Sequence, residues 1–417
     1  MKKKVIKCGK LFNAVDGSAE VGKIIRIEDN VISEVLDGKN YTPSQGEEII
    51  DLSDKFVMPG LVDGHVHIAF CGGLSITEVN EPGDLVDMKA LRNVQADLMA
   101  GFTTLRDLGY PTPRGSQCIR DAINSNIVWG PRIFTSGMYI TQTGGHMAAQ
   151  YPQDAFGQQT FKPINTADGP YEVRTACRAM LKYGVDFLKI MVTGGVYSNS
   201  GDIGGQNMDY DEIKAAVDVA RMHHVKISCH AHGASGIRDA ARAGISSIEH
   251  CALADDECID LMLKNNVIAV PTLLTFRGVM ETGKQRGCPD SIVAKAAFLA
   301  PRHAANIRRM YERGVTCLFG TDTGTPLMVH GQQHGEFKCM TDAGISPTDT
   351  LLGATRRWAE FMGWEKRLGT IEAGKLADII AVNGDPLVDM GVMDAKNIGF
   401  VMKDGVVYKS NGAPCRY

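Results

Sequence analysis

The chain has 417 residues, 44% of them hydrophobic and 22% charged, with 44 Lys and Arg against 48 Asp and Glu. This is the composition of an ordinary soluble globular protein. A net charge of −4, with no basic run beyond Lys2–Lys4, argues against nucleic acid or an anionic membrane as the main partner. Neither class of partner is therefore expected.

The cysteines and the hydropathy pattern indicate in which cellular compartment the protein is expected. The 11 cysteines are scattered and contain no C-x-x-C pair, so we expect mostly buried, reduced thiols. The apolar run after Lys4 breaks off too early for a signal peptide, and no later stretch reaches the roughly 18 apolar residues of a membrane helix. A cytoplasmic location is the prediction.

In chain order, the first part of the sequence reads as short strands separated by turn signals such as Asp29-Asn30. The expected segments are Val5–Cys8, Ile24–Glu28, Val31–Leu36 and Glu48–Asp51. Strand patterns return after Gly369, at Ala377–Val382, Ile398–Met402 and Val406–Lys409. We therefore predict one small β-sandwich domain built from both chain ends, residues 1–58 and 370–417.

Residues 59–369 alternate between β-branched runs and helical patterns, such as Tyr210–His223 with Asp209 as its cap. The eight expected strands are Leu61–Ile68, Gly101–Leu108, Pro131–Ser136, Asp186–Val192, Val225–His230, Ser246–His250, Val267–Pro271 and Thr316–Gly320. This pattern predicts an α/β fold, a (β/α)8 TIM-like barrel. An open doubly wound sheet is the alternative, but no G-x-G-x-x-G or P-loop sequence supports it.

Ligand-type side chains gather at the expected carboxyl ends of these strands, where barrel active sites lie. In the sequence Asp-Gly-His65-Val-His67, residues i and i+2 of a strand share a face, so both imidazoles can reach one metal. Lys189 lies inside an otherwise apolar strand, where an ammonium group is costly. The other strand ends carry His230, His232, His250 and Asp322. A metal-dependent site explains this set better than core packing does.

These residues, in this order, resemble the amidohydrolase superfamily, and the flanking sequence resembles its imidazolonepropionase-related, Xaa-Pro dipeptidase-like branch. The matching stretches are Met58–His67, Gly101–Asp107, Thr143–His146, Lys189–Gly195, His230–Gly233 and Gly374–Asp378. The resemblance spans essentially the whole chain, including the split β domain. It implies a hydrolase that forms homo-oligomers of undetermined order.

The resemblance also implies a centre with two divalent metal ions. The strand-four lysine of this family, Lys189 here, reacts with carbon dioxide to give an N6-carboxylated side chain that bridges the ions. The implied ligands are His65, His67 and Asp322 for the more buried ion, His230 and His250 for the more exposed ion, and Lys189 between them. Zinc is expected from the mixed imidazole and oxygen ligands, although manganese, iron or cobalt also suit them. A bridging hydroxide would attack the substrate, with Asp322 as the general base.

Other residues are candidates for contacts with the substrate or the transition state. Gly144-Gly145 can let a loop present His146 to the oxyanion, although a solvent-facing loop histidine is the alternative. Tentative substrate contacts are Tyr197, His232, Arg277, as a cation for a terminal carboxylate, and His330. Packing, surface or solvated loop positions are the alternatives for these four. The insertion at 147–170 can form a lid, which the sequence does not decide.

Some chemically capable residues have ordinary structural explanations. His223, His224 and His303 fall in helical stretches and are expected on the outer surface. Arg106 and Asp107 end the second barrel strand, where a structural ion pair is the simplest interpretation.

The expected reaction is hydrolysis of an amide bond in a small molecule such as a dipeptide or an N-acyl amino acid. Ring opening or deamination, as in mononuclear cyclic amidine and imidazolone hydrolases, is the alternative. Those relatives lack the strand-four lysine, so the presence of Lys189 counts against this alternative reaction. A non-enzymatic scaffold is disfavoured because the ligand set is complete. The sequence does not identify the substrate.

Overall fold

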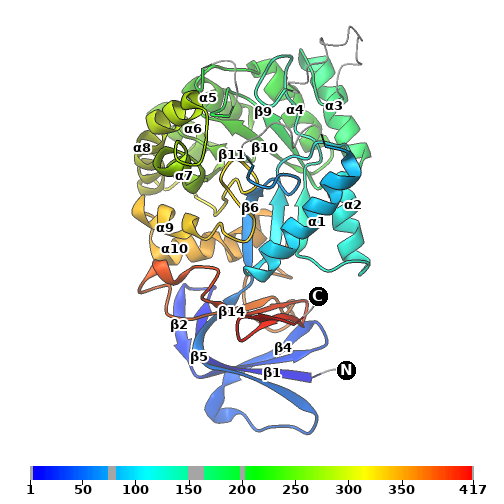
Figure 1. Cartoon of the computed structure of the whole chain (residues 1–417), viewed down its shortest axis with the longest axis vertical. Coiled ribbons are helices and arrows are strands. Elements are labelled where there is room, and N and C mark those ends of the chain that lie inside the picture. The colour runs from blue at the N-terminus through cyan, green and yellow to red at the C-terminus, as the bar shows by residue number, and fades with distance from the viewer. Residues whose placement is uncertain (1–2, 74–80, 149–163, 198–201, 416–417) are drawn as a thin grey trace.

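The computed structural model describes residues 3–73, 81–148, 164–197 and 202–415. Figure 1 shows a body of helices around strands above a strand-rich sheet, and both ends of the chain enter that sheet. The blue amino-terminal strands and the red carboxy-terminal strands lie side by side there. The chain is a mixed α/β protein whose two ends build one sheet, as predicted.

The sheet contains strands from both ends of the chain. The amino-terminal strands are β1 (Lys3–Asn13), β2 (Ser18–Val21), β3 (Lys23–Glu28), β4 (Val31–Asp37) and β5 (Glu47–Pro59), with the 3-10 turn η1 (Gly38–Asn40). The carboxy-terminal strands are β13 (Ile379–Val382), β14 (Ile398–Lys403), β15 (Val406–Ser410) and β16 (Ala413–Pro414), with η4 (Met390–Val392). They form one nine-stranded sheet in the order β16-β15-β14-β13-β5-β1-β3-β4, with β2 on β1. Alternating apolar residues such as Ile6, Cys8 and Leu52 give the sheet its own core.

The central region supplies parallel strands and the helices that cover them. The strands are β6 (Leu61–Val66), β7 (Phe102–Asp107), β8 (Arg132–Thr135), β9 (Phe187–Met191), β10 (Lys226–Ala231), β11 (Ser247–His250) and β12 (Ile268–Val270). The helices are α1 (Gly83–Met99), α2 (Gly115–Asn124), α3 (Pro170–Lys182), α4 (Tyr210–Met222), α5 (Ala234–Ala243), α6 (Asp256–Lys264), α7 (Leu273–Thr282), α8 (Asp290–Glu312), α9 (Gly335–Asp342), α10 (Pro347–Gly353) and α11 (Arg356–Phe361). Asp209 caps α4 in a capping box with Glu212, which confirms the predicted helix start.

The eighth predicted strand, Thr316–Gly320, is the exception. This segment makes one isolated bridge, from Cys317 to β12, and a second isolated bridge joins Thr323, beyond the predicted strand, to β6. Its backbone bonds alternate between the two neighbours: Leu318 N donates to Ala269 O (2.9 Å), and Phe319 O accepts from Gly64 N (3.1 Å). Such alternation is normal for a strand between two parallel neighbours, but here only a single bridge forms on each side, so the segment is not a regular strand. The segment nevertheless links β12 to β6.

The other junction between the parallel strands lies between β8 and β9. Asp186 N donates to Thr135 O (2.8 Å), and Ile140 forms an isolated parallel bridge with Ile190 of β9. The sheets β6-β7-β8 and β12-β11-β10-β9 are therefore linked on both sides by backbone hydrogen bonds. This arrangement brings the carboxyl ends of the parallel strands to one face of the body.

A buried arginine fastens the parallel strands to the nine-stranded sheet. Arg132 of β8 donates to Asp378 Oδ2 and Asp404 Oδ1, both at 2.8 Å, and Asp378 is buried. Arg132→Ala would leave Asp378 buried without its counter-ion, so we expect the free energy of unfolding to fall by about 3–5 kcal/mol. Urea unfolding of the variant measures this loss. The exposed Arg308→Ala, which breaks only the surface pair with Glu312, is the control and should unfold like the wild type; an equal effect of both changes would contradict the prediction.

Two further expectations concern thiols and membranes. All 11 cysteines are free, and eight of them are buried. No helix in the described ranges has the length and apolar character needed to cross a membrane.

Candidate active site

A cavity of about 460 Å³ opens at the carboxyl ends of the parallel strands. It is lined by nine of the predicted site residues: His65, His67, His146, Lys189, Tyr197, His230, His232, His250 and Asp322. They come from β6, β9, β10 and β11 or the residues directly after these strands, from the segment after 316–320 and from two loops. Residues far apart in the sequence are therefore brought together at one place, as the barrel interpretation predicted.

His65 and His67 turn the same ring nitrogen toward Asp322. The Nε2 atom of each histidine lies 3.3 Å from Asp322 Oδ1. The Nδ1 atoms donate elsewhere, from His65 to a Glu249 carboxylate oxygen (2.8 Å) and from His67 to the Gly109 carbonyl (3.3 Å). Because these partners only accept, each Nδ1 carries a proton, and a metal ion beside Asp322 would be bound through the two Nε2 atoms. Acceptor atoms that converge without a proton between them fit a cation.

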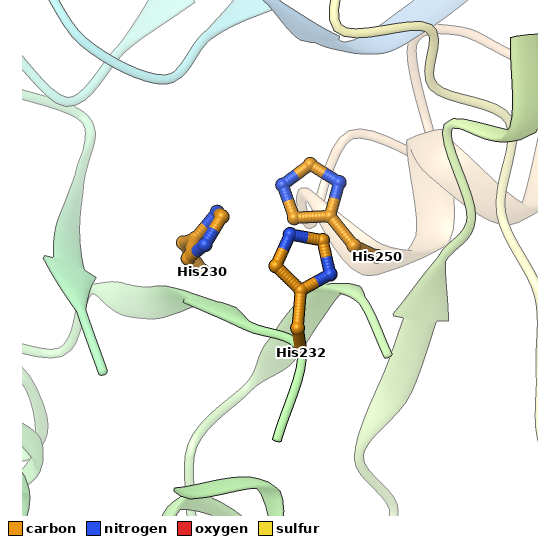
Figure 2. Close-up of side chains that lie close together, drawn as sticks. All are labelled: His230, His232 and His250. Atoms are coloured by element: carbon orange, nitrogen blue, oxygen red, sulfur yellow. The ribbon is translucent and has the colours of Figure 1, made fainter. Parts of the chain in front are cut away.

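The second group of imidazoles lies beside the first. Figure 2 shows His230, His232 and His250 close together, and their ligand atoms lie within 4.8 Å of one another. His230 Nε2 donates to Gly194 O (3.1 Å), which leaves Nδ1 with its lone pair, and His250 Nδ1 contacts Thr272 Oγ1 (2.6 Å). All three rings are buried, and burial lowers the pKa of each well below the usual value. Neutral imidazoles of this kind suit metal ligation.

His232 differs from its two neighbours. Neither of its buried ring nitrogens has a hydrogen-bond partner among the described residues. Its ring stacks on that of His250 (4.9 Å between centroids) and meets that of His230 edge to face (4.7 Å). Because a buried imidazole normally satisfies its N–H group, this side chain is set up to contact something that occupies the cavity.

Lys189 is almost fully buried, with 1% of its surface exposed. Burial lowers the pKa of its amine to about 8, although nearby Glu249 opposes the shift. No hydrogen bond or salt bridge of its ammonium group is found in the described part of the chain. A buried lysine without an ion pair is rare, and at a lowered pKa more of its amine is neutral and nucleophilic.

The backbone is strained where the site residues leave their strands. His250 has φ of +72°, Thr272 +55° and Asp322 +61°, in the left-handed region that favours glycine. Such conformations persist where surrounding structure enforces them, and they cluster at functional sites. For Asp322, burial alone would raise the carboxyl pKa, but the adjacent His65 and His67 rings hold it well below its usual range.

His146 and Tyr197 complete the wall. The ring of His146 lies 4.2 Å from that of His230 and against Gly195, where a Cβ atom would come within 2.2 Å of it. Burial lowers the pKa of His146 to about 3, so the ring is neutral near pH 7. Tyr197 donates or accepts a hydrogen bond with Thr275 Oγ1 (2.8 Å). The prediction that His146 reaches the site is therefore consistent with its place in the cavity wall.

Two of the tentative substrate contacts lie elsewhere. Arg277 is partly exposed on α7 and pairs with Glu281 (2.9 Å) and Asp342 (3.0 Å), away from the cavity. His330 is buried, but Asp97 and the carbonyls of His67 and Phe70 engage both of its ring nitrogens. Neither residue is among the described residues that line the cavity: Arg277 forms surface ion pairs, and His330 contacts the backbone after β6. Most of the expected lid, 149–163, lies outside the described residues.

Three other interpretations change as well. His303 was expected on the outer surface, but it is fully buried on α8 and its Nε2 donates to His250 O (2.7 Å). Arg106 and Asp107 do not pair with each other, because adjacent strand residues face opposite sides. Arg106 instead contacts Glu249 (3.1 Å), a residue that the sequence reasoning passed over. The signal was present, because Glu249 stands inside the expected strand Ser246–His250, next to His250.

The comparison with known proteins agrees with this fold. The model of the amidohydrolase family matches residues 56–409, so the chain belongs to that family. A crystal structure of a Xaa-Pro dipeptidase with bound methionine is 35% identical, with a TM-score of 0.89 over 98% of this chain and 100% of that one. A prolidase crystallised with N-methylphosphonate-L-proline is 29% identical, with a TM-score of 0.88 and the same coverage. Ochratoxinase of Aspergillus niger is 29% identical over 85% of this chain and 76% of its own length.

These relatives confirm the predicted resemblance to the Xaa-Pro dipeptidase-like branch. They also identify the chain as a hydrolase that acts on carbon–nitrogen bonds.

Proposed function

We propose that this protein is a two-metal amidohydrolase that cleaves an amide bond in a dipeptide or an N-acyl amino acid. The observation that carries the proposal is the convergence of six imidazoles, one carboxylate and one buried lysine on a single cavity. His65, His67 and Asp322 would hold one ion, His230 and His250 the other, with carboxylated Lys189 between them. Zinc is the metal that this donor set fits best.

The bound metals would lower the pKa of a water molecule and polarise the substrate carbonyl. Asp322 takes the proton of the attacking water and returns it to the nitrogen of the leaving amine. The Nε2 atoms of His65 and His67 each lie 3.3 Å from Oδ1 of this carboxylate, so all three groups would share the metal ion, and that ion would keep Asp322 ionised. Lys189 forms its carbamate when the neutral amine attacks carbon dioxide, with loss of one proton.

The cavity wall favours an apolar substrate. Lys189 and Asp322 are the charged side chains among the described lining residues, and both belong to the proposed metal centre. Beyond them the wall is built from Phe70, Met147, Met191, Val196, Phe276 and Ile292. The bound methionine of the Xaa-Pro dipeptidase structure is an amino acid of this apolar kind. We therefore propose apolar side chains on at least one side of the scissile bond.

His232 is proposed as a substrate contact and His146 as the helper of the oxyanion. Both rings are neutral and line the cavity. A neutral imidazole can donate one N–H bond to an oxygen of the substrate as charge develops there.

The function is tested with a library of dipeptides, N-acyl amino acids, lactones and cyclic amidines. We expect fastest turnover of amides with apolar side chains, loss of activity after removal of metal by a chelator, and recovery with zinc and bicarbonate. Activity that survives complete metal removal, or turnover of cyclic amidines alone, would contradict the proposal.

His146→Ala is expected to lower kcat by about 10²–10³-fold, because one preorganised donor to the oxyanion is lost. Metal content should stay at the wild-type value, since His146 is not a proposed ligand. The matched control is His223→Ala, at the exposed end of α4. Steady-state kinetics on the best substrate of the library measure the change in kcat. A kcat of His146→Ala within threefold of the wild type would show that His146 does not stabilise the oxyanion.

A further inference from the structure

Glu249 is fully buried next to His65, one of the proposed metal ligands. Its Oε2 accepts the Nδ1 proton of His65 at 2.8 Å. Its Oε1 accepts from Arg106 Nη1 (3.1 Å), Ser247 Oγ (2.9 Å) and Ser228 Oγ. Both carboxylate oxygens are therefore used, and each faces a different set of partners.

The groups that face Glu249 Oε1 require a hydrogen-bond acceptor at that position. Arg106 also donates to Gly64 O (3.1 Å) and Ser247 Oγ (3.0 Å), and its guanidinium lies over the Phe187 ring at 4.4 Å. A guanidinium group has only donors, so the atom that faces Arg106 must accept. Burial would raise the pKa of Glu249, but Arg106 and His65 hold it below its usual range.

We propose that Glu249 is a positioning residue that fixes the tautomer of His65. By holding the proton on Nδ1, it leaves the Nε2 lone pair facing Asp322 Oδ1, 3.3 Å away, where a metal would bind. The inference rests on the proposed function only in requiring that a metal binds His65 Nε2. It adds that Arg106 controls this ligand through Glu249, although Arg106 touches neither His65 nor Asp322 by any hydrogen bond or salt bridge found among the described residues.

The test is Glu249→Gln, which keeps the shape of the side chain. Arg106 must face the amide oxygen, so the amide NH2 group turns toward His65 Nδ1. Nδ1 must then accept, and the ring proton moves to Nε2, which can no longer bind a metal. We expect the affinity for one zinc ion to fall by about 10–100-fold, measured by competition with a chromophoric chelator.

The double variant Arg106→Met/Glu249→Gln separates the tautomer from general damage. Without the guanidinium, the amide can turn its oxygen to His65 and donate its NH2 group to the Ser228 and Ser247 hydroxyls. The charge pair is also removed as a unit, which leaves no buried charge unpaired. We therefore expect the double variant to bind zinc more tightly than Glu249→Gln alone.

Glu336→Gln is the matched control, because Glu336 is equally buried but, within the described ranges, its side chain accepts only from the backbone N–H groups of Leu273 and Leu274. It should lose stability and keep zinc affinity. Wild-type affinity in Glu249→Gln, or no recovery in the double variant, would overturn the proposal. If Glu249→Gln does not fold, the double variant is compared with the wild type: a zinc affinity near the wild-type value supports the proposal, and a fall of about 10-fold or more overturns it. A wild-type protein that binds one zinc ion would contradict the two-metal function and still report on Glu249, whereas one that binds none would overturn both.

Discussion

Replacing Lys189 with alanine is expected to lower kcat/KM by at least about 10³-fold and to remove metal from the site. Lys189 is buried in the cavity wall without an ion pair among the described residues, and its carbamate is proposed to supply an oxygen to each ion. Alanine removes both ligand contacts and leaves a space of carboxylate size. Steady-state kinetics and metal analysis by mass spectrometry on the same sample measure the two losses together.

The space left by Lys189→Ala allows a rescue experiment. A short carboxylic acid such as acetate or propionate can occupy the position of the carbamate, so we expect it to restore part of the activity and of the bound metal. Lys182→Ala, at the exposed end of α3, is the control and should behave as the wild type. Near-normal hydrolysis by Lys189→Ala would contradict the role given to the carbamate.

Asp322→Asn is expected to lower kcat by about 10²–10⁴-fold in a protein that stays folded. Asparagine has nearly the same shape and tolerates the φ of +61° at this position, so the backbone gains little strain. Its amide cannot accept the proton of the attacking water. The loss should therefore appear in kcat more than in KM, measured on the best substrate of the library.

The control for this variant is Asp218→Asn, which affects only surface pairs with Lys214 and Arg221. A kcat of Asp322→Asn within tenfold of the wild type would mean that another group moves the proton. His146 would then be the next candidate, because it lies in the same cavity.

Much of the fold could be predicted from the sequence because its signals are local. Seven of the eight predicted strands form, and Asp209 caps α4 as its sequence indicates. The His65-x-His67 pair turns both rings to one face because alternate residues of a strand share a side. The segment at Thr316–Gly320 failed as a strand because its pairing depends on two neighbours that the local pattern does not show.

The partners of long side chains could not be predicted, because they depend on distant residues. Arg106 and Glu249 are 143 positions apart, and Arg277 meets Asp342 65 positions later. His303 falls in a helical stretch and was expected on the surface. Its ring is instead buried, and its Nε2 donates to the carbonyl oxygen of His250 on β11. These tertiary contacts decide which polar residues serve the site and which only support it.

The central claim is that two metal ions bind around Lys189 and Asp322. The most direct test is the number of metal ions per chain, measured by mass spectrometry on protein purified without chelators and with bicarbonate present. The account predicts about two ions per chain, both lowered by Lys189→Ala. One ion or fewer, with no increase on adding zinc and bicarbonate, would contradict it.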